Sequence, residues 1–229
     1  MLEFKEFKSI GRMSKNCVIT EKINGTNAQI CIIKATKDYQ YEDFTGITYN
    51  ISKDLCMFIP KDELEQYCLG QKDDFYMFAG SRNRWLKIGD DNFGFASWVK
   101  ANTEELFKLG EGTHYGEWAG KGIQRGYGLT EKRFYLFNTS RWADYHNPPK
   151  QTEDDKTIYA PQCCYVVPVL YEGIFTTDAV EIVMTQLKEH GSYIVPFMNP
   201  EGVVVYHIAT KTLFKKTFDD NHKGVKANG

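Results

Sequence analysis

The sequence predicts an α+β fold in which largely antiparallel sheets are flanked by helices. Two observations support this class: short β-type runs recur along most of the chain, and only a few segments show the apolar spacing of an amphipathic helix. The strands do not alternate regularly with the helices, which argues against a Rossmann or flavodoxin arrangement.

Two β-type runs stand near the start of the chain, at residues 18–20 and 28–32. Asn24 and Gly25 lie between them, and Asn-Gly is a strong signal for a tight hairpin turn. We therefore expect the two runs to pair as a hairpin, with Lys22 at a strand end beside the turn. Further strands are predicted at residues 75–78, 133–137, 164–170 and 202–208.

Three helices are predicted, each followed by a glycine, at residues 61–68, 94–109 and 178–189. In the third, Asp178 and Glu181 resemble a capping box. The polar segment 139–160 contains two adjacent prolines and is predicted to be a surface loop or insertion.

The composition narrows the function classes. A net charge of −2 does not indicate a nucleic-acid binder, so any phosphate-binding surface must be a local patch. The six cysteines form no Cys-x-x-Cys motif and no His-Glu-x-x-His pair is present, which argues against a zinc hydrolase. No Walker A loop is present either. Without a signal peptide or an apolar run of membrane-spanning length, we expect a cytoplasmic protein, in the host cytoplasm if the source is viral.

Four charged motifs carry the functional argument, and they lie at residues 21–27, 115–120, 201–205 and 213–216. Together they supply a lysine amine, two carboxylates and a basic pair, which is the equipment for attack by a lysine on a nucleotide α-phosphate. Lys-x-x-Gly occurs four times, beginning at Lys8, Lys22, Lys188 and Lys226. Lys22 differs from the others because it stands between two β-type runs. A lysine is almost fully protonated at neutral pH, so it must lose a proton before it attacks phosphorus.

These motifs resemble those of the covalent nucleotidyltransferase superfamily, which contains ATP-dependent RNA ligases, DNA ligases and mRNA capping enzymes. Residues 21–27 match without a gap the Glu-Lys-x-x-Gly-Thr-Asn motif of small phage-type RNA ligases similar to T4 RNA ligase 2. Asn24 stands where many DNA ligases and capping enzymes have Asp. The resemblance extends from about residue 18 to residue 216 and implies a ligase-type, ATP-grasp-like nucleotidyltransferase domain.

The resemblance implies catalytic roles for three lysines. Lys22 corresponds to the nucleophile that forms a lysine–AMP phosphoramidate. Lys215 and Lys216 correspond to the last, lysine-rich motif, whose lysines neutralise the α-phosphate. Thr217 stands where the common Lys-x-Lys pattern has its second lysine, so Lys215 is the safer match and the place of Lys216 stays open.

Other residues correspond to nucleotide-binding positions. Glu117 corresponds to the carboxylate that binds the ribose, Phe137 to the aromatic that stacks on adenine, and Glu201 to the ligand of a catalytic Mg²⁺ or Mn²⁺. Arg82, with Arg84 as the alternative, corresponds to the arginine that contacts ribose or phosphate. The full predicted nucleotide-binding set is Glu21, Ile23, Gly25, Asn27, Arg82, Glu117, Phe137 and Glu201.

The sequence therefore predicts an ATP-dependent RNA ligase that joins a 5′-phosphate end to a 3′-hydroxyl end of nucleic acid, with RNA preferred and no membrane partner. Residues 1–229 are expected to form one nucleotidyltransferase domain. Only residues 217–229 follow Lys216, so we expect no C-terminal oligonucleotide-binding domain. The alternatives are a minimal ATP-dependent DNA ligase, a GTP-using capping enzyme and a non-catalytic nucleic-acid-binding module.

Overall fold

The computed structural model describes residue 12 and residues 14–34, 40–42, 48–50, 66–148 and 157–219. The chain divides into two compact units. The first consists of Met1–Ile23 and Pro168–Gly229, and the second of Asn24–Val167. Most strand pairs are antiparallel, so the predicted α+β class with largely antiparallel sheets is confirmed. The prediction of a single nucleotidyltransferase domain stays a prediction.

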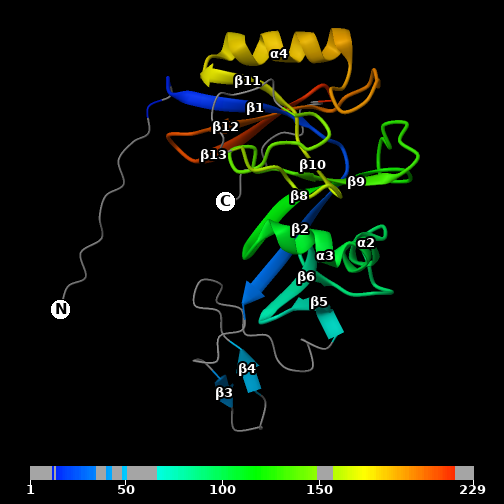
Figure 1. Cartoon of the computed structure of the whole chain (residues 1–229). Helices are drawn as coiled ribbons and strands as arrows, with labels where there is room; N and C mark the ends of the chain where they lie inside the picture. The colour runs from blue at the N-terminus through cyan, green and yellow to red at the C-terminus, as the bar shows by residue number, and fades with distance from the viewer. Residues whose placement is uncertain are drawn as a thin grey trace, which may run out of the picture. The chain divides into compact units, whose positions relative to one another are not determined.

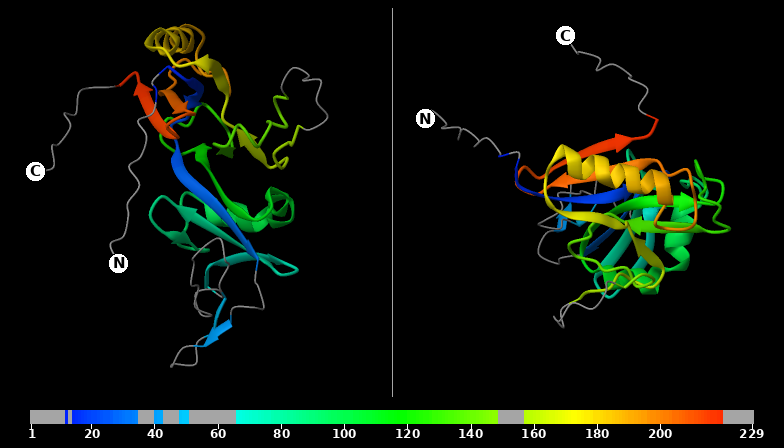
Figure 2. Two further views of the ribbon diagram at one scale, coloured as in Figure 1. Left: turned by 90° about the vertical axis from the view of Figure 1, so that its left-hand side faces the viewer. Right: turned by 90° about the horizontal axis from the view of Figure 1, so that it is seen from above.

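The first unit is a four-stranded antiparallel sheet with one helix, α4 (Thr177–His190), across one face (Figures 1 and 2). The strand order is β11-β1-β12-β13, with bounds β1 (Asn16–Lys22), β11 (Val169–Ile174), β12 (Gly202–His207) and β13 (Thr212–Thr217). Alternate residues of β1 and β12 are buried against the apolar stripe of α4. Since side chains alternate along a strand, the intervening residues belong to the opposite face.

Helix α4 confirms the predicted apolar stripe, because Val180, Val183, Met184 and Leu187 are all buried. Its predicted capping box is wrong. The N-cap is Thr176, whose Oγ1 accepts a hydrogen bond from the backbone N–H of Ala179 at 3.0 Å. The helix ends at Gly191, as predicted, where φ is 79°.

The second unit is built on a seven-stranded sheet with the order β10-β9-β8-β2-β6-β5, in which β7 also pairs with β6. Its strands are β2 (Thr26–Lys34), β5 (Cys68–Lys72), β6 (Phe75–Ser81), β7 (Trp85–Leu86), β8 (Gly112–Gly120), β9 (Lys132–Leu136) and β10 (Cys164–Val166). Only β10 and β9 pair in parallel among the strands of this sheet that the structure describes. A separate ribbon pairs β3 (Gln40–Glu42) with β4 (Thr48–Asn50).

One face of this sheet carries the main core. Its aromatic centre joins Trp118 of β8 and Phe134 of β9 to Phe95 of the helical segment, with ring centroids 5.3 Å and 5.1 Å from Phe95. The predicted helix at 94–109 is divided into α2 (Phe95–Ala101), α3 (Thr103–Leu106) and the 3₁₀ helix η1 (Phe107–Leu109). The break falls at Asn102, whose side chain donates to the carbonyl of Trp98 at 2.8 Å and competes with the helical backbone pattern.

Three other predictions of local structure differ from the structure in whole or in part. β1 and β2 lie in different sheets, so Asn24-Gly25 connects two sheets and is not a hairpin turn. Of the helix predicted at 61–68, residues 66 and 67 are helical, Cys68 already belongs to strand β5, and residues 61–65 lie outside the described part of the chain. The predicted strand at 164–170 is two strands in different sheets, β10 and β11, separated at Pro168, which has no N–H to donate to a ladder. Of the predicted loop 139–160, only residues 139–148 and 157–160 are described.

Candidate functional site

Lys22 is the last residue of β1 and forms an ion pair with Glu201. The Lys22 Nζ lies 2.7 Å from Glu201 Oε1, and the two side chains are 23% and 17% exposed. Glu201 directly precedes β12, and Lys22 pairs with Gly202, the first residue of that strand. The antiparallel pairing of β1 with β12 therefore brings the first and third charged motifs together.

The backbone conformation and the close packing at position 202 require a glycine. Its φ is 146°, and a Cβ built there would lie 2.1 Å from the carbonyl oxygen of Lys216. Gly202 pairs with Lys22 on one side and with Thr217 on the other. The strand position beside Lys22 consequently carries no side chain.

The register of this sheet separates the two lysines of the last motif. Lys215 pairs with Val204, which pairs with Thr20, two residues before Lys22. Residues directly opposite one another on neighbouring strands share a face, and residues two apart on one strand also share a face. Lys215 and Lys22 therefore belong to the same face of the sheet.

Lys216 belongs to the opposite face, which α4 covers. It pairs with Val203, a buried residue that packs against the helix, and its Nζ forms an ion pair with Glu181 of α4. Thr217, one residue further along β13, lies on the same face as Lys22. A Lys-x-Lys pattern would thus place both lysines on the Lys22 face, whereas this chain places one lysine and one threonine there.

Glu21 is on the α4 face and is 1% exposed. Its carboxylate accepts a hydrogen bond from Ser192 Oγ at 2.6 Å and another from the backbone N–H of Tyr193 at 2.8 Å. Burial raises the pKa of Glu21, and these two hydrogen bonds oppose that rise. Glu21 anchors the segment that follows α4, and Ile23 is also buried. Sequence reasoning missed Ser192, for which the chain offers no local signal.

In the second unit, Glu117 of β8 is held by the end of the first motif. Its Oε1 accepts from the backbone N–H of Gly25 at 3.1 Å, and its Oε2 accepts from Asn27 Nδ2 at 3.1 Å. Asn27 and Glu117 are partners in the β2–β8 ladder. These donors fix the orientation of a carboxylate that is only 8% exposed.

A glycine is needed at position 25 because the backbone there lies close to β8, and not because it forms a turn. A Cβ at this position would lie 2.5 Å from the carbonyl oxygen of Trp118 and 2.9 Å from the Cβ of Ala119. The absence of a side chain lets the backbone N–H of Gly25 reach Glu117.

The two candidate arginines have different partners. The Arg82 Nε donates to Asn27 Oδ1 at 2.8 Å, so Arg82 joins the cluster formed by Asn27 and Glu117. Arg84 instead pairs with Asp90, with 2.7 Å between Nη1 and Oδ2. The structure thus brings Gly25, Asn27, Arg82 and Glu117 together and leaves Arg84 outside the cluster.

Phe137 lies one residue beyond β9 and is 43% exposed. Its backbone N–H donates to the carbonyl of Tyr115 at 3.0 Å, which extends the β8–β9 ladder by one residue. Phe134 is buried in the core. The stacking role of Phe137 stays a prediction.

Tyr127 was missed by sequence reasoning. Its hydroxyl accepts a hydrogen bond from the backbone N–H of Asn24 at 2.8 Å, and Arg125 N–H donates to Asn24 Oδ1 at 3.3 Å. Tyr127 lies in the glycine-rich segment 120–128, and that composition was the available signal. This segment holds the chain where it leaves β1 and enters β2.

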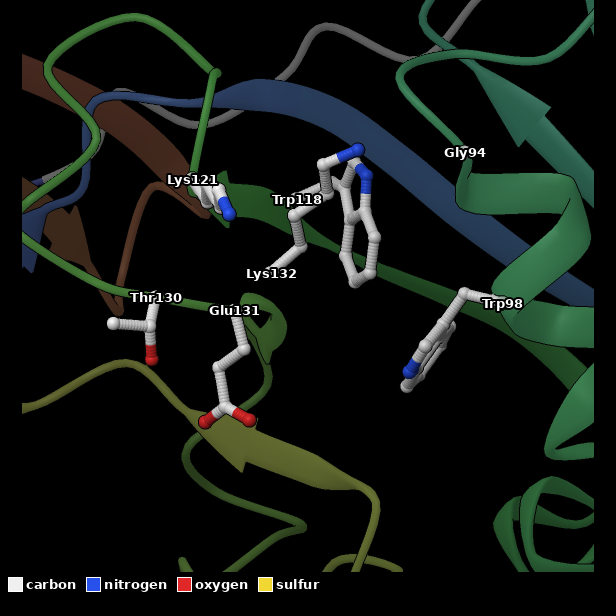
Figure 3. A pocket seen from close by; sticks show the side chains of 7 residues that line it. All are labelled: Gly94, Trp98, Trp118, Lys121, Thr130, Glu131 and Lys132. Carbon is white, nitrogen blue, oxygen red and sulfur yellow. The ribbon is translucent and has the colours of Figure 1, made fainter.

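A cavity of about 340 Å³ lies on the helix-covered side of the second unit's sheet (Figure 3). It is lined by Gly94, Trp98, Trp118, Lys121, Thr130, Glu131 and Lys132. None of the predicted site residues lines it. Within the described residues, no three His, Cys, Asp or Glu side chains gather as a metal site. In the same part of the chain, no helix is long and apolar enough to span a membrane.

Comparison with known proteins decides the family. The family model for RNA ligase matches residues 15–220. The chain belongs to the RNA ligase family. Assignment of this RNA ligase family member to the small phage-type subgroup stays a prediction. No curated protein matches the sequence.

Solved structures of an RNA ligase from Naegleria gruberi are similar to this family member. A mutant with AMP and Mn is 16% identical with a TM-score of 0.49, and an apo mutant is 17% identical with a TM-score of 0.47. In both comparisons the match covers 90% of this chain and 50% of the other. The chain thus spans about half the length of these relatives.

Proposed function

We propose that this chain is an ATP-dependent RNA ligase that works through a covalent lysine–AMP intermediate. The observation that carries the proposal is the pairing of Lys22 with Glu201, 2.7 Å apart, on the sheet face that also holds Lys215. A nucleophilic amine, a carboxylate and a second cation are the groups that nucleotidyl transfer to lysine requires. Membership in the RNA ligase family supports the choice of RNA as substrate.

In the first step, the Lys22 ammonium releases a proton to solvent and its amine attacks the α-phosphorus of ATP. A nitrogen–phosphorus bond forms, the bond from the α-phosphorus to the bridging oxygen breaks, and pyrophosphate leaves with that oxygen. Glu201 holds the Lys22 side chain at the end of β1 before the reaction. Lys215 supplies positive charge to the α-phosphate as negative charge develops there.

In the second step, an oxygen of a 5′-phosphate end attacks the same phosphorus. The nitrogen–phosphorus bond breaks, which restores Lys22 and leaves AMP joined to the strand by a 5′-5′ pyrophosphate. In the third step, a 3′-hydroxyl attacks the 5′-phosphate of that strand. The hydroxyl releases its proton to solvent and a phosphodiester bond forms. The bond from that phosphorus to the bridging pyrophosphate oxygen breaks, and AMP leaves with that oxygen.

Nucleotide binding is assigned to the cluster of the second unit. Glu117 accepts hydrogen bonds from ribose hydroxyls, and Gly25 and Asn27 hold its carboxylate in orientation. Arg82 contacts ribose or phosphate through the guanidinium that Asn27 positions. Phe137 offers an exposed ring to adenine. Glu21 and Ile23 are buried and support the strand that carries Lys22.

Glu201 is also suited to hold Mg²⁺ or Mn²⁺. Magnesium accepts few protein ligands and prefers oxygen, and Glu201 provides a partly exposed carboxylate beside the attacking amine. When bound, such a cation neutralises phosphate charge and orients phosphate oxygens. We propose the cytoplasm, or the host cytoplasm, as the location of the reaction.

Labelling with α-³²P-ATP and Mg²⁺ or Mn²⁺, followed by denaturing electrophoresis, tests the proposal. We expect covalent label on the chain that is lost in Lys22→Ala. Lys188→Ala is the matched control, because Lys188 begins another Lys-x-x-Gly sequence in the last turn of α4 and should label like wild type. Label from GTP alone would indicate a capping enzyme, and no label from either nucleotide would refute the proposed chemistry.

The nucleic acid is tested separately with strands that already carry the 5′-adenylyl group. Sealing of RNA in preference to DNA of the same sequence supports an RNA ligase. Preferential sealing of nicked DNA would indicate a minimal DNA ligase instead.

A further inference from the structure

A continuous row of side chains leads away from Glu117 along the second unit's sheet. Glu117 pairs with Tyr135 in the β8–β9 ladder, and Tyr135 pairs with Tyr165 in the β9–β10 ladder. The rings of Tyr135 and Tyr165 have centroids 5.3 Å apart, so both belong to the face that carries Glu117. Two strand spacings separate Tyr165 from Glu117, which is about 10 Å.

Tyr165 is the centre of a packed stack. The His146 ring lies over it, with centroids 4.2 Å apart and planes 18° from parallel. The Arg133 guanidinium lies 4.6 Å from the centroid of the same ring. Tyr165 is partly buried, with its ring in contact with both His146 and Arg133, and it serves as a support for the outer end of the row.

Tyr145 and Tyr159 lie at the outer end of this row and are exposed. The two side chains are 48% and 45% exposed, with ring centroids 6.4 Å apart and planes at 82°. Tyr145 also contacts the edge of His146, with centroids 5.7 Å apart. Ile158, beside Tyr159 in the sequence, is 58% exposed. Large exposed side chains gathered at one place indicate a binding surface.

The backbone holds the two exposed tyrosines in place. The N–H of Ala143 donates to the carbonyl of Ile158, and the N–H of Ala160 donates to the carbonyl of Ala143, both at 2.9 Å. The Asp144 carboxylate accepts from the N–H groups of His146 at 2.8 Å and Val166 at 3.3 Å. The backbone that carries the two rings is therefore held before any ligand arrives, which lowers the entropic cost of binding.

We propose that Tyr145 and Tyr159 form a stacking platform for unpaired bases of the RNA strand that the enzyme seals. This inference rests on the proposed function, because it takes Glu117 as the nucleotide-binding carboxylate from which the row starts. The continuity of the row with Glu117 favours RNA over a protein partner. Tyrosine rings stack on any base, so the platform tolerates sequence and selects for unpaired strands.

The test measures binding of a fluorescein-labelled single-stranded RNA with a 5′-phosphate by fluorescence anisotropy. We expect the double variant Tyr145→Ala/Tyr159→Ala to bind at least about tenfold more weakly, since base–aromatic stacking contributes about 1–3 kcal/mol per base. Tyr145→Phe/Tyr159→Phe keeps both rings and should restore binding. Ile182→Ala, which removes a side chain 58% exposed on α4, is the control and should bind like wild type.

Self-labelling with α-³²P-ATP is measured on the same variants and should be unchanged, together with Tm to show that they are folded. Two results would overturn the platform: wild-type RNA affinity in the alanine variant, or competition by fully paired RNA as strong as that by single-stranded RNA. Either result would leave a protein as the ligand for this surface. If wild type fails to label with ATP but RNA binding still depends on the two rings, the ligase proposal fails and the platform stands.

Discussion

Two adjacent lysines, Lys215 and Lys216, should differ sharply in their effect on adenylylation. Lys215 shares the sheet face of Lys22, and Lys216 faces α4. In the proposed mechanism, replacing Lys215 by alanine removes a cation from the developing charge on the α-phosphate. Loss of one preorganised donor of this kind costs about 10²–10³ in rate, or about 3–4 kcal/mol.

Lys216→Ala removes only the ion pair with Glu181. The two side chains are 40% and 62% exposed, and an exposed ion pair contributes about 0.2–1 kcal/mol to the free energy of unfolding. The expected result is a small loss of stability and an adenylylation rate within about fivefold of wild type. Thr217→Lys places a second lysine on the Lys22 face and should rescue part of the rate lost in Lys215→Ala.

The assay is single-turnover formation of labelled protein from α-³²P-ATP, quenched in acid at intervals, with Tm measured for each variant. A larger rate loss in Lys216→Ala than in Lys215→Ala, at equal Tm, would show that the face assignment does not govern catalysis.

Three further predictions concern stability. Gly25→Ala should destabilise the fold by about 1–3 kcal/mol, because the new Cβ meets the Trp118 carbonyl at 2.5 Å; an unchanged Tm in thermal unfolding would contradict this close packing. The Tm of Glu21→Gln minus the Tm of wild type should increase as the pH is raised. Burial raises the pKa of Glu21 in the folded state above its ordinary value. Between those two pKa values the folded state binds more protons than the unfolded state, so wild type loses stability as the pH rises through this range. A Tm difference that does not vary with pH would refute this. Leu187→Ala should lower the free energy of unfolding by about 2–5 kcal/mol in urea titration, whereas Ile182→Ala, on the exposed side of the same helix, should change it by less than about 0.5 kcal/mol. Similar losses in both would contradict the packing of α4.

Much of the fold was predictable where local signals and tertiary packing agree. The stripe of α4 and its final glycine follow from sequence periodicity, and both hold because the helix buries that stripe on one sheet. The hairpin at Asn24-Gly25 fails because Asn-Gly signals a turn only when the flanking strands pair with each other. Those strands find better partners far along the chain, in β12 and β8, and no local pattern reports them.

The candidate site was likewise predictable from the sequence only in part. The motifs identify Lys22, Glu117 and Glu201 as residue types suited to the chemistry, and Arg82 as the better of two candidate arginines, with Arg84 as the alternative. Only the structure joins Arg82 to Asn27 and pairs Arg84 with Asp90, because hydrogen-bond partners depend on which strands are neighbours.

The sequence by itself determined the family, the positions of the charged motifs and the alternation of side chains along each strand. The tertiary structure decided which faces those side chains share. That choice depends on strand register, which is set by burial of the apolar side chains of β1 and β12 against α4. Alternation along β13 puts Lys215 and Lys216 on opposite faces, but it does not say which of them shares the face of Lys22. Register decides that, and it is a property of paired segments that lie about 180 residues apart in the sequence.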